Sequence, residues 1–127
     1  MSPRCEPNED LQQWEIITVA FPFTDSARKK PRPVLILSNS RFNRASNSIV
    51  VCQITSNLGS GFKEYNVEIT GDDVCLYEGA FIRPSLIKPY VVFSISKREV
   101  RTRIGMLSPE KIDEVKASLG KLFSTGG

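Results

Sequence analysis

One arginine of the sequence stands where it could bind a phosphate group. Arg32 lies between Pro31 and Pro33, directly before the apolar run "VLILS". Each proline fixes its own φ at about −65°, so the backbone on both sides of Arg32 is already restricted before anything binds. A guanidinium offers a planar fork of donors for two phosphate oxygens, and it could stabilise negative charge that builds on a phosphorane. The structural alternative is an ion pair with Asp25 that fixes the turn.

The cations are concentrated in two short segments, although the net charge is only +3. Residues 28–44 contain no acid and residues 97–103 contain one, Glu99. Ten of the 17 cations fall in these segments: Arg28, Lys29, Lys30, Arg32, Arg41, Arg44, Lys97, Arg98, Arg101 and Arg103. A basic surface attracts phosphate backbones at long range, but a run of cations is also common on an ordinary solvated surface. Lys30 and Arg44 are therefore candidate phosphate contacts.

The residues that are absent exclude several kinds of catalysis. The chain has no histidine, which removes Ser-His-Asp triads, Cys-His pairs and paired-histidine ribonuclease chemistry. Asp72 and Asp73 are adjacent and would point to opposite faces of a strand, so they make a poor magnesium site. No glycine-rich phosphate loop occurs. We expect no metal and no cofactor, which leaves cation-based phosphate chemistry or binding without chemistry.

The three cysteines are odd in number and far apart in sequence, and without histidine they do not form a zinc site. We predict reduced thiols, with Cys52 in "IVVCQIT" as a core residue. The chain contains no apolar run of membrane-spanning length, and its first residues lack the pattern of a signal peptide. These features predict a soluble, cytoplasmic protein without a membrane partner.

Residues 1–13 are polar and aperiodic, and we predict a loose arm followed by one domain over 14–127. Strands are expected at 15–21, 33–39, 48–55, 65–70, 79–96 and 98–105, with Pro84 and Pro89 marking edges or bends. In the last strand, Val100, Thr102 and Ile104 should face inward, and Arg101 and Arg103 outward. A helix should follow the N-cap Ser108. This order favours a small, mainly β protein, an antiparallel barrel with a C-terminal helix.

Several motifs resemble one toxin family. The run "WEIITVAFPFTDSARKKPRPVLILSNSRFN" is similar to the opening of the MazF/PemK endoribonuclease toxins, with its "PFPFTD" and "RPxLVLS". The segments "NRASNSIVVCQITS" and "RPSLIKPYVVFSISKREVRTRIGMLSPEKI" match later family features in the same order, so the resemblance covers about residues 14 to 123. It implies the SH3-like barrel shared by MazF and CcdB toxins, a homodimer and an antitoxin partner. It also implies cleavage of single-stranded mRNA without metal, leaving 2′,3′-cyclic phosphate and 5′-hydroxyl ends.

The resemblance assigns roles to particular residues. Arg32 matches the catalytic arginine of the family, and Thr55 matches the threonine that bonds the scissile phosphate. Ser56 could add a second hydroxyl. Taken from the residues alone, the preferred interpretation of Thr55 is a turn residue at the end of a strand.

One part of the pattern differs from the family. Several members carry an arginine and, two residues later, an aspartate before "GxLS". An ungapped count back from Gly105 places Lys88 and Tyr90 there, while Arg83 fits only with a gap of five residues. All three are candidate substrate contacts. The general base is unassigned: Asp25 is the acid nearest to Arg32 in sequence, but it could equally form an Asx-type turn.

The leading hypothesis is an antitoxin-controlled endoribonuclease that selects particular RNA sequences. Two alternatives stay open on the same barrel. The Lys88 and Tyr90 differences could mean that the chain only binds nucleic acid, with cations and aromatic stacking. A gyrase-directed toxin of the CcdB type is the other, although the C-terminal "LFSTGG" lacks the Trp-Gly-Ile ending expected there.

Overall fold

The computed structural model describes residues 5–20 and 30–126, so residues 1–4, 21–29 and 127 lie outside the described part. Seven strands are present: β1 (Glu15–Val19), β2 (Arg32–Ile36), β3 (Ser48–Thr55), β4 (Val67–Ile69), β5 (Val74–Leu76), β6 (Ser85–Ser96) and β7 (Val100–Leu107). The helices are α1 (Ser40–Ala45) and α2 (Pro109–Leu122), with short 3₁₀ turns η1 (Gly71–Asp73) and η2 (Lys97–Glu99).

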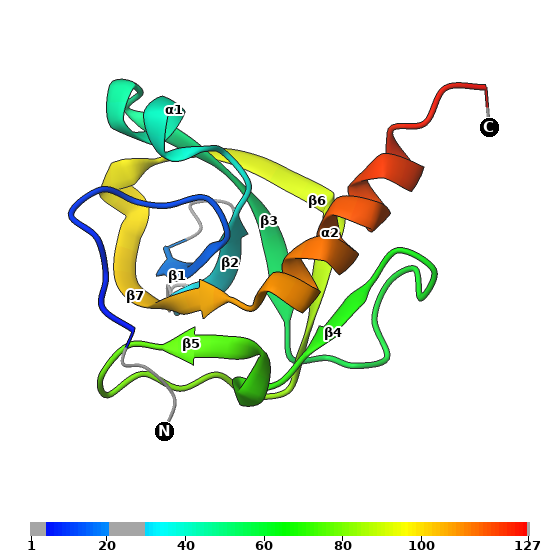
Figure 1. The fold of residues 1–127 in the computed structure, drawn as a ribbon, viewed down its shortest axis with the longest axis horizontal. Coiled ribbons are helices and arrows are strands. Elements are labelled where there is room, and N and C mark those ends of the chain that lie inside the picture. Colours follow the sequence, from blue (N-terminus) through cyan, green and yellow to red (C-terminus); the bar gives the residue numbers. More distant parts are fainter. Residues whose placement is uncertain (1–4, 21–29, 127) are drawn as a thin grey trace.

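The strands form one antiparallel sheet in the order β4-β6-β3-β2-β1-β7-β5. This sheet curls into a nearly closed barrel, and α2 packs across β6 and β4 (Figure 1). The predicted fold, a mainly β antiparallel barrel with one C-terminal helix, is confirmed.

The central strands are buried on both faces, which explains their continuous apolar sequence. Ile16 and Leu35 belong to one core cluster, whereas Ile17, Val34 and Ile36 belong to another. Neighbouring residues of a strand point to opposite sides, so each strand contributes to two cores. The central sheet is consequently a rigid frame for residues at its strand ends.

The C-terminal helix begins as predicted. The Ser108 side chain accepts a hydrogen bond from the Lys111 backbone N–H, and Pro109 occupies the first turn, where its missing N–H costs nothing. Val115 is fully buried in the first core cluster. Among the described residues, no helix combines the length and apolar character needed to cross a membrane.

Two elements were not predicted, and one strand is longer than its prolines suggest. Neither α1 nor the three-residue β5 was expected from the sequence pattern. Strand β6 continues through Pro89, but its register with β3 jumps there: Gln53 pairs with Lys88, and the next residue, Cys52, pairs with Val92. The bend expected at Pro89 is therefore a bulge within one strand.

The prediction of reduced thiols was wrong for two cysteines. Cys5 and Cys75 form a disulfide with their Cα atoms 5.7 Å apart, which links the N-terminal segment to β5. Cys52 is free and fully buried, as expected of a core residue. A pairing across 70 residues depends on how the chain folds and cannot be inferred from spacing.

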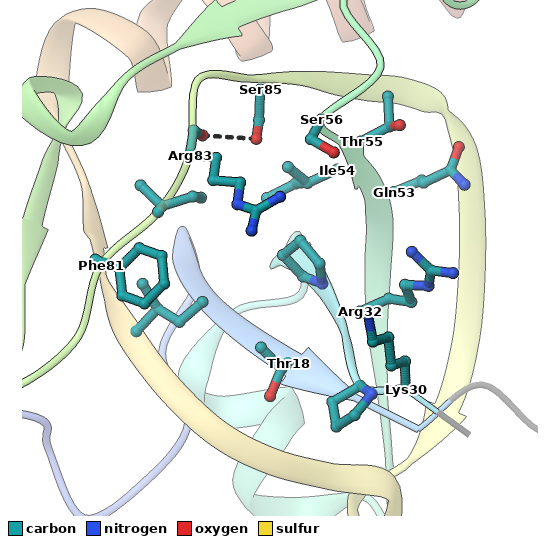
Figure 2. Close-up of a pocket in the computed structure, with 14 residues that line it drawn as sticks. Thr18, Lys30, Arg32, Gln53, Ile54, Thr55, Ser56, Phe81, Arg83 and Ser85 are labelled. Carbon is teal, nitrogen blue, oxygen red and sulfur yellow. Dashed lines mark hydrogen bonds between the residues drawn. The ribbon is translucent and has the colours of Figure 1, made fainter. Parts of the chain in front are cut away.

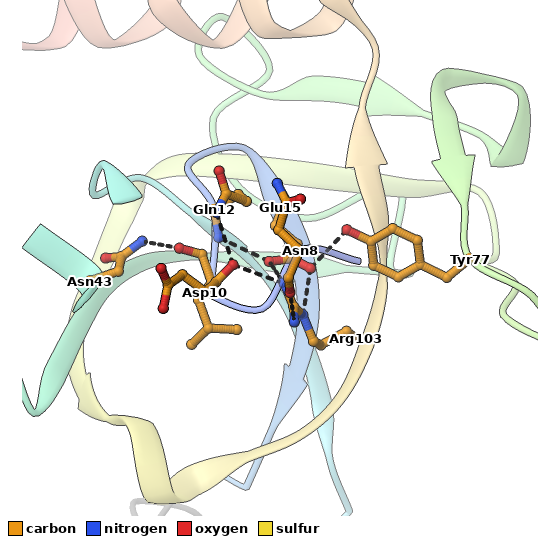
Figure 3. A network of polar contacts seen from close by, with 8 residues as sticks. Asn8, Asp10, Gln12, Glu15, Asn43, Tyr77 and Arg103 are labelled. Carbon is orange, nitrogen blue, oxygen red and sulfur yellow. Dashed lines mark hydrogen bonds and ion pairs between the residues drawn. The ribbon is translucent and has the colours of Figure 1, made fainter. Parts of the chain in front are cut away.

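The N-terminal segment is also held by polar contacts (Figure 3). Arg103 donates hydrogen bonds to the backbone carbonyls of Asn8 and Asp10, and Asn43 donates one to the carbonyl of Leu11. The described part of the segment that the sequence predicts to be a loose arm is thus fastened to the barrel. Arg103, expected on an outward cationic face, instead points to the buried carboxylate of Glu15.

Candidate functional site

A cavity of about 540 Å³ opens where β1, β2 and β3 meet the segment that leads into β6 (Figure 2). Three of its residues are cations and four carry hydroxyl groups, with the remainder mostly apolar. The full lining is Thr18, Lys30, Pro31, Arg32, Pro33, Gln53, Ile54, Thr55, Ser56, Phe81, Ile82, Arg83, Ser85 and Ile104. The fold therefore brings Arg32, Thr55, Ser56, Lys30 and Arg83 together.

Arg32 is held at the entrance of the cavity by the strand that it begins. It is the first residue of β2 and pairs with Val19 of β1. The following residues Val34, Leu35 and Ile36 are fully buried, so the strand cannot shift without opening the core. The Arg32 side chain itself is exposed. The buried strand after the second proline thus anchors a cation that faces solvent.

Thr55 and Ser56 place two hydroxyls at the end of β3. Thr55 pairs with Leu86 of β6 and is followed directly by Ser56. The Thr55 Oγ1 accepts a hydrogen bond from the backbone N–H of Asn57 at 3.1 Å. A hydroxyl has one hydrogen to donate, so this bond leaves the Thr55 O–H available to an acceptor in the cavity.

Arg83 enters the cavity from the side opposite to Arg32 (Figure 2). Its backbone carbonyl accepts a hydrogen bond of 2.7 Å from the Ser85 Oγ, just before β6 begins. The side chain is exposed, like that of Arg32. Two guanidinium groups therefore face one space from two walls.

None of the described residues that line this cavity is acidic, so none of them compensates its positive charge. Three arginines elsewhere have acidic partners: Arg44 with Asp10 at 2.9 Å, Arg103 with Glu15 at 2.7 Å, and Arg101 with Glu99 at 3.6 Å. Within the described residues, no ion pair involves Lys30, Arg32 or Arg83. The cavity is consequently suited to an anion.

The sequence of residues 12–123 matches the family of PemK-like, MazF-like toxins of type II toxin-antitoxin systems. The chain belongs to this toxin family. No curated protein sequence matches the chain.

Solved structures of toxins share the barrel. The Mycobacterium tuberculosis toxin MazF-mt6 is 19% identical with a TM-score of 0.66, over 86% of this chain and 95% of that one. A MazE-MazF structure from Deinococcus radiodurans is 18% identical with a TM-score of 0.68, over 88% of this chain and 94% of that one. An endoribonuclease in complex with its cognate antitoxin from Mycobacterial species is 13% identical with a TM-score of 0.65, over 90% of this chain and 93% of that one. These similarities show a common fold.

Lys88 and Tyr90 lie outside the cavity of this PemK-like toxin. The Lys88 side chain is largely buried and its Nζ donates to the Ser60 Oγ. The Tyr90 hydroxyl accepts from the Phe62 backbone N–H and donates to Asn66, each at 2.8 Å. Both side chains hold down the 57–66 loop.

Gly61 passes directly over them, with φ at +76° and space for no Cβ, which would come within 1.9 Å of the Tyr90 hydroxyl. The places where the family carries an arginine and an aspartate are thus structural in this ungapped alignment, and Arg83 is the residue that reaches the cavity. The β6 bulge lies on the way: one step along β3, from Gln53 to Cys52, corresponds to four steps along β6, from Lys88 to Val92. An ungapped count from Gly105 runs through this irregularity.

Two other residues that the sequence predicts for the site, Arg44 and Asp25, are not among the described residues of the cavity lining. Arg44 lies on α1, pairs with Asp10 and does not line the cavity. Asp25 lies outside the described residues. Sequence reasoning did not find Thr18, Gln53 or Phe81, which also line the cavity. No sequence signal set Phe81 apart, since it lies in the run 79–96 that the sequence predicts to be a strand.

Proposed function

We propose that this toxin is a metal-independent endoribonuclease that cleaves single-stranded mRNA at selected sequences. The observation that carries the proposal is the convergence of Arg32, Arg83 and Thr55 on one cavity, whose described lining holds no acid, in a chain of this family. In the proposed reaction the ribose 2′-oxygen attacks the adjacent phosphorus and the bond to the 5′-oxygen breaks. The products carry a 2′,3′-cyclic phosphate and a 5′-hydroxyl.

The two arginines supply the electrostatic part of this reaction. The phosphorane formed by attack carries more negative charge on its non-bridging oxygens than the starting phosphodiester does. Guanidinium groups on two walls could bond these oxygens, with Lys30 adding charge on the side of Arg32 (Figure 2). Preorganised donors aimed at developing charge are usually the largest single contribution to catalysis.

The hydroxyls at the end of β3 supply orientation. Because the Thr55 oxygen already accepts from Asn57, its own hydrogen is directed to another acceptor, and a phosphate oxygen suits this role. Ser56 is exposed beside it and could bond a neighbouring sugar or phosphate. These contacts would align the 2′-oxygen and the leaving 5′-oxygen on opposite sides of the phosphorus.

A proton must leave the 2′-hydroxyl and another must reach the 5′-oxygen. None of the described residues that line the cavity is an acid, so Asp25 remains our candidate for the base. Asp25→Asn should lower the cleavage rate and remove the acidic limb of its pH profile. An unchanged profile would assign the base elsewhere.

We also propose an antitoxin partner whose acidic segment covers the cations of this cavity, and a homodimer as the active form. Lys30, Arg32 and Arg83 support the first point, since they have no ion pair with a described residue and an acidic chain would neutralise all three. Sedimentation at several concentrations tests the dimer. An acidic peptide should slow cleavage by the wild type in a salt-dependent way.

The decisive experiment is incubation of purified protein with a long RNA in EDTA, followed by mapping of both new ends. Cyclic phosphate at one end and a 5′-hydroxyl at the other, at recurrent sequences, is the expected result. Products with 5′-phosphates would refute the chemistry. RNA that binds in a salt-dependent way and stays intact would indicate a module that only binds nucleic acid.

A further inference from the structure

Phe81 is an aromatic side chain that the fold leaves in water beside the proposed site. At 73% it has the highest exposed fraction of the large apolar side chains in the described part of the chain. It belongs to neither core cluster, yet it lines the cavity. Because burial of a phenylalanine ring is favourable, an exposed ring at a binding cavity points to a ligand that covers it.

The backbone on both sides of Phe81 is fixed. Before it, the Tyr77 N–H donates to the carbonyl of Ile104 at 2.9 Å, and the Ala80 N–H donates to the carbonyl of Tyr77 at 3.0 Å. After it, the Ser85 hydroxyl bonds the carbonyl of Arg83. The ring is therefore presented on an anchored segment, which lowers the entropy lost when a ligand stacks on it.

The neighbours of Phe81 define the ligand. Figure 2 shows Phe81 on the same side of the cavity as Arg83, with Arg32 and Lys30 across from it. An apolar protein segment laid on the ring would leave these cations desolvated and unpaired, which is costly. A nucleotide satisfies both features, since its base has a flat face for the ring and its phosphate has oxygens for the cations.

We propose that Phe81 is the stacking platform for a base next to the scissile phosphate, and so helps to hold the RNA in position for cleavage. This inference rests on the proposed ribonuclease function. Arg83 would bond the phosphate while Phe81 holds the attached base, so the two residues fix one nucleotide at two points. Because the ring contacts the flat face of the base, binding should depend on the presence of a base more than on its hydrogen-bonding groups.

The test uses a short single-stranded RNA in which fluorine replaces every 2′-hydroxyl, so that binding is measured without cleavage. One base at a time is removed along the strand, and the dissociation constant is determined by fluorescence anisotropy. For the wild type we expect one position where loss of the base weakens binding by about 5- to 150-fold. Phe81→Leu should weaken binding to the intact strand by a similar factor and abolish the penalty at that one position.

Phe123→Leu is the matched control, since Phe123 is 71% exposed and lies at the end of α2, outside the cavity lining. It should bind like the wild type, and Phe81→Trp should retain the base dependence. Urea unfolding of each variant verifies that the exposed substitutions leave the fold intact. If loss of a base weakens the binding of Phe81→Leu at the same position and by the same factor as in the wild type, the inference is wrong. It is also wrong if Phe81→Leu changes only the oligomeric state.

Cleavage of unmodified RNA separates this inference from the proposed function. If the wild type cuts RNA and Phe81→Leu cuts the same sites at the same rates, Phe81 is no platform and the ribonuclease proposal stands. Base-dependent binding that vanishes in Phe81→Leu, without any cleavage by the wild type, supports the platform and refutes the ribonuclease.

Discussion

Two regions of this toxin use arginine in opposite ways. Arg103 forms bonds to both carboxylate oxygens of Glu15, at 2.7 and 2.9 Å, and Glu15 is fully buried (Figure 3). Arg32 and Arg83 face an open cavity whose described lining contains no acid. The first region is a closed network, and the second leaves its donors available.

The closed network satisfies nearly every donor and acceptor that it contains. Besides Arg103, the Tyr77 hydroxyl donates to Glu15 at 2.8 Å, and the Gln12 N–H donates at 3.0 Å. Arg103 also bonds two carbonyls of the N-terminal segment. A buried charge must be paired and hydrogen-bonded, so this arginine is structural. The cavity arginines form no ion pair with any residue that the structure describes, which favours a ligand role.

The largest expected effect is loss of the pair between Arg103 and Glu15. Arg103→Ala leaves Glu15 as an uncompensated buried charge and should lower the free energy of unfolding by about 3–5 kcal/mol. Urea unfolding followed by circular dichroism measures it. Adding Glu15→Gln to Arg103→Ala removes the stranded charge and should recover part of the loss. A loss below about 1 kcal/mol would mean that water reaches Glu15.

The next effect concerns activity and leaves stability alone. Arg32→Ala should lower the RNA cleavage rate about 10²–10³-fold, as expected when one preorganised donor to developing charge is removed. Because the Arg32 side chain is exposed and has no described ion-pair partner, the free energy of unfolding should change by under about 0.5 kcal/mol. Single-turnover cleavage and urea unfolding on the same preparation separate the two quantities. A rate equal to that of the wild type would remove Arg32 from the mechanism.

A smaller effect sharpens the description of the closed network. Tyr77→Phe deletes one hydrogen bond to a buried carboxylate, so the free energy of unfolding should fall by about 1.5–3 kcal/mol at neutral pH. Burial, together with the hydrogen bond and charge of Glu15, raises the pKa of Tyr77 above its ordinary value of 10.0.

The raised pKa also gives a pH dependence with a definite sign. As the pH rises past about 10, the unfolded chain loses the phenolic proton first and the folded protein keeps it. The free energy of unfolding should therefore fall above that pH, by at most about 1.4 kcal/mol per pH unit from this group. The same titration of Tyr77→Phe should be flatter there. Equal slopes for the two proteins would show that the tyrosine does not titrate differently on folding.

The open region was partly predictable because two of its residues are tied to strand ends. Arg32 follows from its prolines and the apolar run after it. Thr55 ends the predicted strand 48–55, although the resemblance to the toxin family is what singled it out. A strand end fixes a side chain locally, so a pattern in the sequence carries over to a position in space. The two-sided burial of β2 and the helix start at Ser108 were predictable for the same reason.

Arg83 and Phe81 were harder because they lie on an irregular segment between β5 and β6, where no periodicity orients a side chain. The ungapped count that pointed to Lys88 and Tyr90 crosses the β6 bulge. The conformation of an irregular segment depends on tertiary contacts, which cannot be inferred from the neighbouring residues in the sequence.

The closed region depends on contacts between distant residues. Glu15 meets Tyr77 and Arg103 across separations of 62 and 88 residues, and Cys5 meets Cys75 across 70. A glutamate at the start of a strand reads as a surface residue until its partners are known. Only the closed barrel brings these groups together, so the sequence alone could not identify the network.

The smallest effect tests whether position, and not charge alone, distinguishes the cavity. Arg44 pairs with Asp10 at 2.9 Å, but the two side chains are 66% and 40% exposed and lie outside the cavity. Arg44→Ala should therefore lower the free energy of unfolding by less than about 1 kcal/mol, since water and salt screen an exposed pair. It removes the same charge as Arg32→Ala, yet the RNA cleavage rate at physiological salt should stay within a few-fold of the wild type. If Arg44→Ala slowed cleavage as much as Arg32→Ala does, overall positive charge would explain RNA recognition, and the distinction between paired and open arginines would fail.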